Sequence, residues 1–282
     1  MNALPTLPDY ELEKELGGGP LTQVFAARHR QGGFRCAVKL LRPEWANDAN
    51  AQQLLRREAR AGLSARHRHL VKLLDAQVMR EPYYIVMELL GGESLRARLR
   101  REYTLEPRIA FWIARQIAEA LLALHKIGFV HADIKPDNIR MLDAGTATLI
   151  DLGFTHRPGE NQALARDGYL FATADYLAPE LCDLKQDHSY ASDWFSFGLT
   201  LFEMLTGTRP FASVSPIETL IQHRDIDVTP VVRKAARNWQ PRLAWLVENL
   251  LKRKPTDRPN GAMVLHELTA LEIAALSVRR AA

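Results

Sequence analysis

The chain has 282 residues, of which 47% are hydrophobic and 25% charged, and its formal net charge is +4. This composition is ordinary for a soluble globular protein, and because no apolar run approaches the ~20 residues that cross a bilayer, no membrane segment is expected. The modest positive charge is spread over helical segments without aromatic platforms or a recognition motif, which argues against nucleic-acid binding.

The N-terminal part of the chain predicts an antiparallel sheet with one helix. Residues 1–9 have neither the basic start nor the apolar stretch of a secretory signal, so we expect an N-terminal extension and a cytoplasmic protein. Short apolar runs between glycine- and proline-containing turns predict strands over residues 10–16, 23–28, 35–41, 71–78 and 83–87. An apolar side within residues 50–65 predicts a helix between the third and fourth strands.

After Gly91 and Gly92 the pattern changes to long helices. Ser94 is placed to cap the first of them, and Pro107 opens a second that runs to His125 and is apolar nearly all round. Further helices are expected over residues 192–206, 216–223, 241–251 and 261–276. We therefore expect an α+β fold with a ligand bound between two lobes. Its parts are an N-lobe (10–87), a hinge (88–93), a mainly helical C-lobe (94–272) and a C-terminal tail (273–282).

The charged groups needed for phosphoryl transfer occur at informative intervals. Asp133, Lys135 and Asn138 lie in the segment His-Ala-Asp-Ile-Lys-Pro-Asp-Asn, and Asp151 opens the later segment Asp-Leu-Gly. An acid that reaches a substrate hydroxyl, with an amide and a second acid that ligate Mg²⁺, is the minimal set for acting on a nucleotide triphosphate. A lone aspartate in a loop is usually a capping or turn residue, but the joint spacing disfavours that interpretation.

Further motifs follow in a fixed order along residues 10–271. They are the glycine turn at 17–24, Ala37-Val38-Lys39, the segments around Asp133 and Asp151, Ala178-Pro179-Glu180, the segment around Asp193, and Arg258. In this order they resemble the eukaryotic-like serine/threonine protein kinases, especially the bacterial ones. The resemblance implies a bilobal protein-kinase-like fold and transfer of the ATP γ-phosphoryl group to Ser or Thr hydroxyls of protein substrates. It also implies Mg²⁺ as the metal, with Mn²⁺ as a possible substitute.

The resemblance implies a set of nucleotide-binding residues. Lys39 on the third strand is expected to pair with Glu58 on the following helix and to reach the α- and β-phosphates. The hinge is expected to contact adenine through the Glu88 carbonyl and the Leu90 amide. The other nucleotide-binding residues that it implies are Leu16, Gly17, Gly19, Val24, Ala37 and Arg140.

The catalytic and metal-binding residues follow from the same resemblance. Asp133 would accept or orient the hydroxyl proton, Lys135 would neutralise charge on the transferring group, and Thr173 would contact both. Asn138 and Asp151 would hold Mg²⁺. A lysine two residues after the aspartate is typical of the serine/threonine class. Three further residues are expected to be structural, since they resemble the family's buried acid and its buried ion pair: Asp193, Glu180 and Arg258.

Besides Arg140, three positions depart from the family pattern. Thr22 replaces the third glycine of the turn and is expected to stiffen it without abolishing its role. Leu152 replaces a phenylalanine, which is a milder change. Ala132 stands where many family members have the arginine that binds a phosphorylated activation loop. Because residues 154–171 offer only Thr155 and Tyr169 as acceptors, we hypothesise that activity does not depend on activation-loop phosphorylation.

Arg140 is the least expected residue, because the family usually has an apolar side chain beneath adenine at this position. Its aliphatic stem can form the floor of the site while the guanidinium reaches water. Alternatively, the guanidinium stacks on the base, or a register shift presents Met141 instead. A fourth interpretation is that Arg140 lowers nucleotide affinity, which would favour a regulatory role.

Two other functions remain as alternatives. A nucleotide-binding pseudokinase acting as an allosteric partner or scaffold is suggested by Thr22, Ala132 and Arg140. A small-molecule phosphotransferase of the aminoglycoside-kinase type shares the His-x-Asp…Asn loop, but the Ala-Pro-Glu motif speaks against it. Cys36 and Cys182 lie far apart without a nearby ligand cluster, so they predict neither a disulfide framework nor a zinc site. The sequence does not predict the substrate, the upstream signal or the oligomeric state.

Overall fold

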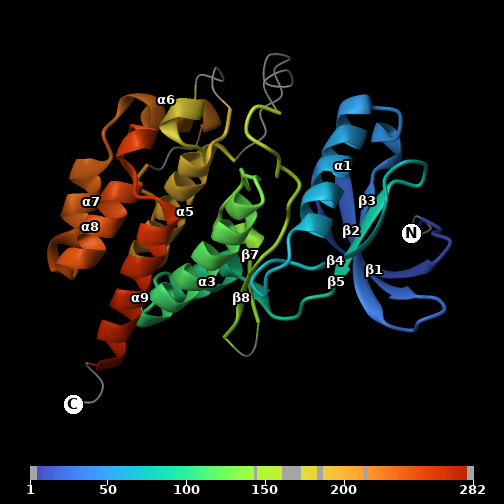
Figure 1. Ribbon diagram of the computed structural model, residues 1–282, viewed down its shortest axis with the longest axis horizontal. Helices are drawn as coiled ribbons and strands as arrows, with labels where there is room; N and C mark the ends of the chain where they lie inside the picture. The colour runs from blue at the N-terminus through green and yellow to red at the C-terminus, as the bar shows by residue number, and fades with distance from the viewer. Residues whose placement is uncertain (1–4, 143–144, 161–172, 183–186, 212–214, 278–282) are drawn as a thin grey trace.

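The computed structural model describes residues 5–142, 145–160, 173–182, 187–211 and 215–277. Two lobes are visible in Figure 1, one formed by the strands β1 to β5 with helix α1 and the other by the remaining helices. The predicted α+β organisation, with an antiparallel N-lobe sheet and a mainly helical C-lobe, is confirmed. In the part of the chain that the structure describes, no helix is long and apolar enough to cross a membrane.

The N-lobe is a five-stranded antiparallel sheet of order β1-β2-β3-β5-β4. Its elements are β1 (Tyr10–Gly18), β2 (Thr22–His29), β3 (Arg35–Leu41), α1 (Ala49–Ser64), β4 (Leu73–Gln77) and β5 (Tyr84–Glu88). Phe25, Val38 and Val86 are paired across three strands and belong to one buried cluster, so they share one face of the sheet. Side chains alternate along a strand, and the opposite face is therefore available to α1, which contacts β3, β4 and β5.

A second, smaller sheet joins the lobes. It has the order β6-β7-β8, formed by β6 (Glu93–Ser94), β7 (Ile139–Met141) and β8 (Ala147–Leu149). The sequence did not predict these strands, because two or three residues are too few to show an alternating pattern. The Leu149 carbonyl accepts from the Val71 amide at 2.9 Å, and the Leu149 amide donates to the His69 carbonyl at 2.8 Å. The loop bearing Asn138 is thus fastened to the N-lobe through backbone hydrogen bonds.

The C-lobe helices lie close to their predicted positions. They are α2 (Leu95–Glu102), α3 (Pro107–Lys126), α5 (Tyr190–Thr206), α6 (Pro216–Asp225), α7 (Thr229–Ala235), α8 (Pro241–Leu250) and α9 (Gly261–Ser277). Short 3₁₀ turns occur at Pro43–Trp45, Pro136–Asn138, Ala174–Tyr176, Pro179–Leu181, Ala236–Asn238 and Pro255–Asp257. The Ser94 hydroxyl accepts from the Ala97 amide and caps α2 as predicted. Helix α7 was missed because its seven residues carry no clear apolar period.

Helix α3 lies against α5 and α9, and ten of its residues are buried. The expectation that it is apolar nearly all round is only partly right, because Trp112 is 44% exposed. The Trp112 Nε1 donates to the Gly145 carbonyl at 2.9 Å. An indole N–H needs a hydrogen-bond acceptor. At the edge of the lobe Trp112 finds one, so its N–H is not buried without a partner.

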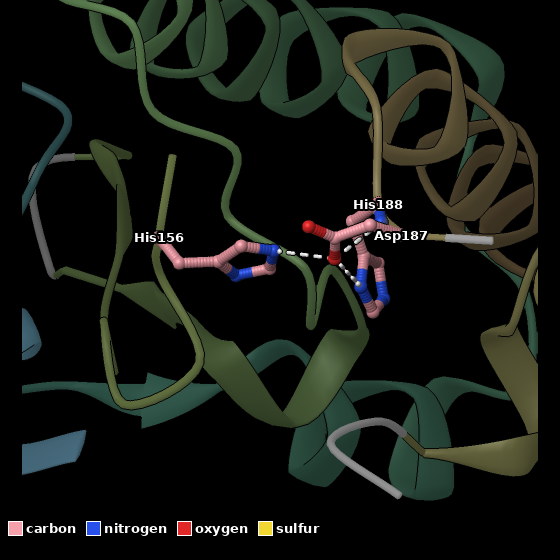
Figure 2. Close-up of side chains that lie close together, drawn as sticks. All are labelled: His156, Asp187 and His188. Atoms are coloured by element: carbon pink, nitrogen blue, oxygen red, sulfur yellow. Dashed lines mark hydrogen bonds and ion pairs between the residues drawn. The ribbon is translucent and has the colours of Figure 1, made fainter. Parts of the chain in front are cut away.

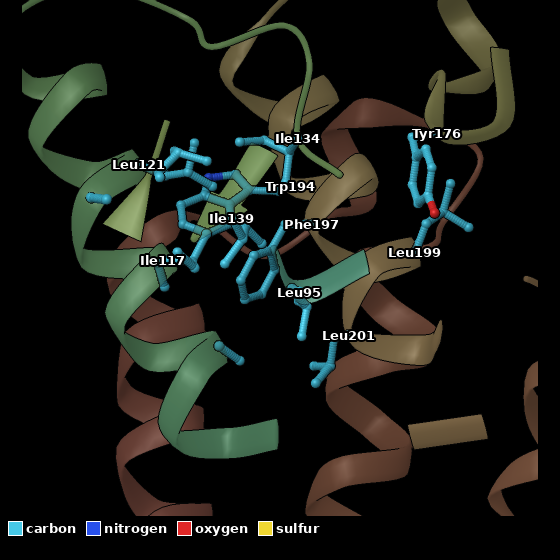
Figure 3. Packing of buried hydrophobic residues seen from close by; sticks show 14 of the residues in the cluster. Leu95, Ile117, Leu121, Ile134, Ile139, Tyr176, Trp194, Phe197, Leu199 and Leu201 are labelled. Carbon is cyan, nitrogen blue, oxygen red and sulfur yellow. The ribbon is translucent and has the colours of Figure 1, made fainter. Parts of the chain in front are cut away.

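The C-lobe core positions the loop that carries the catalytic candidates. Figure 3 shows Trp194 and Phe197 of α5 packed near Ile117 and Leu121 of α3, with residues from the loop and β7 among them. The loop side chains that join this core are Ile134 and Ile139, and both are fully buried. Burying an aliphatic side chain of this size contributes about 1.5–3 kcal/mol. The loop between them is therefore held at both ends by apolar packing.

Candidate active site

Asp133 and its partners form a closed polar cluster. The Lys135 Nζ lies 2.7 Å from the Asp133 Oδ2. The Thr173 hydroxyl accepts from Lys135 Nζ at 2.6 Å and donates to Asp133 Oδ1 at 2.8 Å. The Asn138 Nδ2 donates to both the Asp133 carbonyl and Asp133 Oδ2 at 2.8 Å. These contacts fix the Asp133 carboxylate through both of its oxygens.

Asp193 on α5 fixes the backbone of the catalytic loop by hydrogen bonds. Its carboxylate accepts from the amides of His131 and Ala132 at 2.8 and 2.9 Å and from the His125 Nε2 at 2.8 Å. Burial would raise the pKa of Asp193, but the hydrogen bond and charge of His125 outweigh it and lower the pKa. Ala132 has a φ of 66°, an unfavourable value for a residue with a Cβ, so these bonds stabilise a strained turn. The structural role expected for Asp193 is confirmed.

Lys39 links the N-lobe to the segment that carries Asp151. It lies on the α1 side of the sheet, because its neighbours Val38 and Leu40 belong to the cluster on the other face. The Lys39 Nζ lies 2.8 Å from Glu58 Oε1 and 2.7 Å from Asp151 Oδ1. The predicted ion pair with Glu58 is therefore present, and Asp151 forms a second ion pair with the same ammonium.

The electrostatics of this trio are set by burial and by mutual attraction. Burial alone would lower the pKa of Lys39, but the carboxylates of Asp151 and Glu58 outweigh it and raise the pKa. Burial raises the pKa of Glu58, whereas Lys39 opposes that rise. Burial also acts to raise the pKa of Asp151, but Lys39 lowers it to about 2. Asp151 has a φ of 63°, which turns its backbone sharply at this point.

The glycine turn lies between β1 and β2. A Cβ on Gly18 would lie 2.5 Å from the Thr22 carbonyl oxygen, and Gly17 has a φ of 148°, so neither position accepts a side chain without strain. A Cβ on Gly19 would meet nothing within 4 Å, so steric crowding does not dictate this glycine. Leu16 is half-exposed at the start of the turn.

Two residues that no sequence motif marks hold the glycine turn. The Arg42 Nε donates to the Gly19 carbonyl at 3.0 Å, and the Trp45 Nε1 donates to the Pro20 carbonyl at 3.1 Å. Both acceptors are backbone groups, so the sequence carries no pattern that pairs them with these donors. They fasten the tip of the turn to the end of β3, and with it the turn that was expected to cover the phosphates.

The predicted adenine-binding residues lie on connected elements. Val24 is paired with Lys39 across β2 and β3, and Ala37 lies two residues before Lys39, so all three share one face of the sheet. Glu88 ends β5, and its Oε1 accepts from the Lys72 amide at 2.8 Å. Leu90 is partly buried against the main core. The adenine contacts of the Glu88 carbonyl and the Leu90 amide stay a prediction.

Arg140 lies in the middle of β7, and its Nε donates to the Gly91 carbonyl at 2.9 Å. The pairing of β7 is regular, and Met141 is buried on the opposite side of the strand. A register shift that presents Met141 is therefore wrong. The hydrogen bond to Gly91 directs the guanidinium toward the hinge, as the first of the four interpretations requires, and the role of the aliphatic stem beneath adenine stays a prediction.

The metal-binding candidates present the right atoms for a hard cation. The Asn138 Nδ2 donates to Asp133, so its amide oxygen is the atom directed elsewhere. The Asp151 side chain is 43% exposed although its Oδ1 is bound to Lys39. Carboxylate and amide oxygens are the ligands that Mg²⁺ takes in proteins. The residues therefore fit the divalent metal that the resemblance implies.

One of the two candidate acceptors near the activation segment is inaccessible. Thr155 is buried, and its hydroxyl has no hydrogen-bond partner among the residues that the structure describes. Tyr169, like the rest of 161–172, lies outside the described residues.

The predicted pairing of Glu180 with Arg258 is confirmed. Two guanidinium nitrogens of Arg258 each lie 2.7 Å from a carboxylate oxygen of Glu180. A second such cluster was not predicted from the sequence: Arg96 contacts Glu203 at 2.6 Å and also the Tyr176 hydroxyl. The Arg96 Nε also reaches Asp137 at 3.1 Å, so this cluster supports the catalytic loop from α2 and α5.

Comparison with known proteins agrees with this geometry. The protein kinase domain matches residues 10–268. The chain is 33% identical to the serine/threonine-protein kinase PkaA of Streptomyces coelicolor, over 91% of this chain and 49% of that protein. It is 30% identical to the probable serine/threonine-protein kinase pknA2 of Bifidobacterium longum, over 93% of this chain and 35% of that protein.

A third relative is the serine/threonine-protein kinase PrkC of Bacillus subtilis, which is 30% identical over 89% of this chain and 38% of its own length. The chain thus spans less than half the length of these curated relatives. Members of this family use ATP and a divalent metal. By the domain match, the relatives and the geometry of its polar residues, the chain belongs to the bacterial-type serine/threonine protein kinase family.

Proposed function

We propose that the chain is a catalytically competent kinase that transfers the γ-phosphoryl group of ATP to Ser or Thr hydroxyls of protein substrates. The observation that supports it best is the position of Lys39, whose ammonium contacts Glu58 and Asp151 at once. In active protein kinases the lysine–glutamate pair and the metal-binding aspartate must both be in place. The names of the relatives also support Ser and Thr as acceptors.

The residues around Asp133 suggest how the transfer proceeds. The substrate hydroxyl oxygen forms a bond to the γ-phosphorus while the bond from that phosphorus to the bridging oxygen of ADP breaks. The hydroxyl proton passes to the Asp133 carboxylate, which Thr173 and Asn138 hold in place. Lys135, 2.7 Å from Asp133, is placed to neutralise charge on the transferring group. Mg²⁺ or Mn²⁺ on Asn138 and Asp151, when bound, supplies charge neutralisation at the β- and γ-phosphates.

The alternatives receive less support. A pseudokinase usually lacks one of the charged groups, whereas here the lysine, both acids and the asparagine are present and linked by hydrogen bonds. An aminoglycoside-kinase-type enzyme is disfavoured because the protein kinase match extends through Glu180 and Arg258.

Activity without activation-loop phosphorylation is part of the proposal. Ala132 supplies no cation for a phosphate, and the buried Thr155 offers no accessible hydroxyl. The test is to treat the protein with phosphatase, confirm by mass that it is unmodified, and measure turnover. A large loss of turnover would refute this part of the proposal.

The main test compares wild type with Asp133→Asn in a phosphate-transfer assay with ATP and Mg²⁺, followed by mass spectrometry of the modified sites. Loss of a general base typically costs ~10²–10⁴-fold in rate, and we expect a loss in that range with phosphate on Ser or Thr in wild type. Asp225→Asn is the matched control, because it makes the same chemical change on an exposed carboxylate of α6, outside the candidate site. Equal background incorporation in wild type and Asp133→Asn, across a panel of protein substrates, would instead support a scaffold.

A further inference from the structure

Three titratable side chains meet outside the residues assigned to phosphoryl transfer. Figure 2 shows His156 pointing at Asp187, with the ring of His188 on the other side of that carboxylate. The His156 Nε2 lies 3.1 Å from Asp187 Oδ1, and the His188 Nδ1 lies 4.0 Å from the same oxygen. One nitrogen or oxygen atom from each residue lies within 4.8 Å of the others. All three side chains are largely buried, which is unusual for groups that carry charge.

The cluster joins two segments that are distant in sequence. His156 follows the segment that begins at Asp151, and its backbone pairs with Val130 at the start of the catalytic loop. Asp187 and His188 immediately precede the cap of α5 at Ser189. A bond between them therefore ties the strand leaving the metal-binding aspartate to the helix that carries Asp193.

The hydrogen bonds around His156 orient its ring. The His156 Nδ1 lies 2.7 Å from the Phe154 carbonyl oxygen, which can only accept, so this nitrogen carries a proton. The Nε2 is then the atom directed at Asp187. A metal-bound histidine commonly donates its other ring N–H to a backbone carbonyl, which fixes the ligating nitrogen toward the ion. His156 has this arrangement.

Asp187 is oriented in a similar way. Its Oδ2 accepts from the Gly159 amide at 2.5 Å, and its Oδ1 accepts from the His188 amide at 2.8 Å. Both bonds come from backbone groups, so the carboxylate is held in place by the local fold. Ligating carboxylates are commonly hydrogen-bonded in this manner. The oxygen nearest to both rings, Oδ1, is the candidate ligand atom.

His188 gives an independent reason to expect a ligand. Its side chain is only 12% exposed, yet the 4.0 Å from Nδ1 to the Asp187 carboxylate is too long for a hydrogen bond. Its Nε2 is buried and has no hydrogen-bond partner among the residues that the structure describes. Neither ring nitrogen of His188 therefore makes a hydrogen bond within the described residues, and coordination of an ion through Nδ1, the nitrogen that faces Asp187, would give this buried ring one polar partner.

The spacing of the three atoms suits a small ion with nitrogen ligands. Two ligand atoms bound tetrahedrally at ~2.1 Å from one zinc ion lie about 3.4 Å apart. The separations of 3.1 and 4.0 Å lie on either side of that value, so a modest rotation of the His188 side chain suffices. Two imidazoles and one carboxylate favour Zn²⁺ or Co²⁺ over Mg²⁺, which takes oxygen ligands.

We propose that His156, Asp187 and His188 are three protein ligands of a Zn²⁺ site that clamps the segment after Asp151 to the loop before α5. A fourth position would be taken by water or by a further donor. This site does not depend on the proposed kinase activity, because its residues contact neither Asp133 nor Lys39 in any hydrogen bond or ion pair that the structure describes. Its role is to stabilise the contact between these two segments of the C-lobe.

The test is calorimetric titration of the full chain with ZnCl₂, after chelator treatment and dialysis, without nucleotide and with excess Mg²⁺ present. We expect one Zn²⁺ per chain, an increase in Tm on binding, and an affinity at least ~10–100-fold lower in His188→Gln and in Asp187→Asn. His266→Gln, an exposed histidine on α9, is the matched control and should bind as wild type does. Substitution of Co²⁺ should give the intense visible absorption of a four-coordinate ion in wild type and a weaker spectrum in His188→Gln.

Several outcomes would overturn the proposal. The cluster is only a hydrogen-bonded ion pair if wild type binds Zn²⁺ no more tightly than His188→Gln. Capture by a thiol is shown if Cys182→Ser abolishes binding while Asp187→Asn leaves it unchanged. Should His188→Gln fail to fold, the comparison of Asp187→Asn with His266→Gln decides between the same outcomes, since asparagine preserves the shape of the side chain.

Discussion

The buried cations Arg258 and Lys39 differ in how their charges are compensated. Arg258 is fully buried, with a side-chain exposure of 0%, and all five of its N–H donors have protein acceptors. Those acceptors are both oxygens of Glu180 and the carbonyls of Lys252, Ala191 and Arg253. Lys39 shares one ammonium between two carboxylates, and one of them, on Asp151, is 43% exposed.

The difference shows which cluster is structural and which is prepared for a ligand. A cation whose donors are all used within the protein gains nothing from a further anion or metal. The Lys39 cluster has an excess of negative charge, and its exposed carboxylate can still bind a divalent ion. Under the proposed function, a divalent ion on Asp151 would hold the phosphates near Lys39, whereas both carboxylate oxygens of Glu180 already accept from Arg258.

Arg258→Met should cause the largest loss of stability. Removing one partner of a buried pair leaves Glu180 as an uncompensated charge, and the expected loss in unfolding free energy is about 3–5 kcal/mol. Urea unfolding monitored by tryptophan fluorescence measures it. Arg242→Met is the matched control, since Arg242 pairs with Glu267 at 2.6 Å but is 48% exposed, and it should cost less than about 1 kcal/mol. Equal losses in the two variants would contradict a structural role for Arg258.

Lys39→Met tests the other side of the comparison. Because Lys39 is expected to reach the phosphates, kcat/KM should fall at least ~100-fold, equivalent to about 2.7 kcal/mol of transition-state stabilisation. The unfolding free energy should fall by less than in Arg258→Met, since Asp151 reaches water and Glu58 can take up a proton. Steady-state kinetics and urea unfolding provide both numbers, with the exposed Lys72→Met as control. A variant that unfolds as readily as Arg258→Met but keeps its activity would reverse the assignment.

The pH dependence of the unfolding free energy measures how much ionised Asp151 contributes to stability. Its pKa is lowered from 3.8 to about 2, because Lys39 outweighs the effect of burial. A carboxylate with a lowered pKa stabilises the fold above its unfolded pKa, and this stability is lost as the pH falls through its folded pKa. The difference in unfolding free energy between wild type and Asp151→Asn should therefore shrink between about pH 4 and pH 2. A constant difference over this interval would mean that Lys39 does not hold the ionised form.

The residues predicted from sequence are those whose chemistry demands a particular type at a fixed interval. Asp133, Lys135 and Asn138 lie together because phosphoryl transfer needs their charges, and the structure brings them into one hydrogen-bonded cluster with Thr173. The long helices were predictable for a different reason, since their apolar period repeats over many residues. The cytoplasmic location, the absence of nucleic-acid binding and the domain limits stay predictions.

What the sequence did not reveal depends on backbone groups or on contacts between distant segments. Arg42 and Trp45 hold the glycine turn through carbonyl oxygens, which every residue has, so no motif marks them. His156 and His188 approach each other only because the C-lobe folds α5 against the catalytic loop. Arg96 is one of several arginines on α2, and only packing selects it to contact Glu203.

Arg140 is a third kind of cation, and it carries the smallest expected effect. Its Nε donates to the Gly91 carbonyl. Arg140 therefore differs from Arg258, whose five donors all have protein acceptors, and from Lys39, which contacts two carboxylates. Arg140→Leu keeps an apolar stem at the floor of the site and removes only the guanidinium. We therefore expect ATP affinity to change by less than ~3-fold, or about 0.7 kcal/mol, measured by calorimetric titration with a non-hydrolysable ATP analogue. A gain of tenfold or more would show that the guanidinium obstructs the nucleotide, and the site would then be tuned for weak binding by a residue that the hinge backbone holds in place.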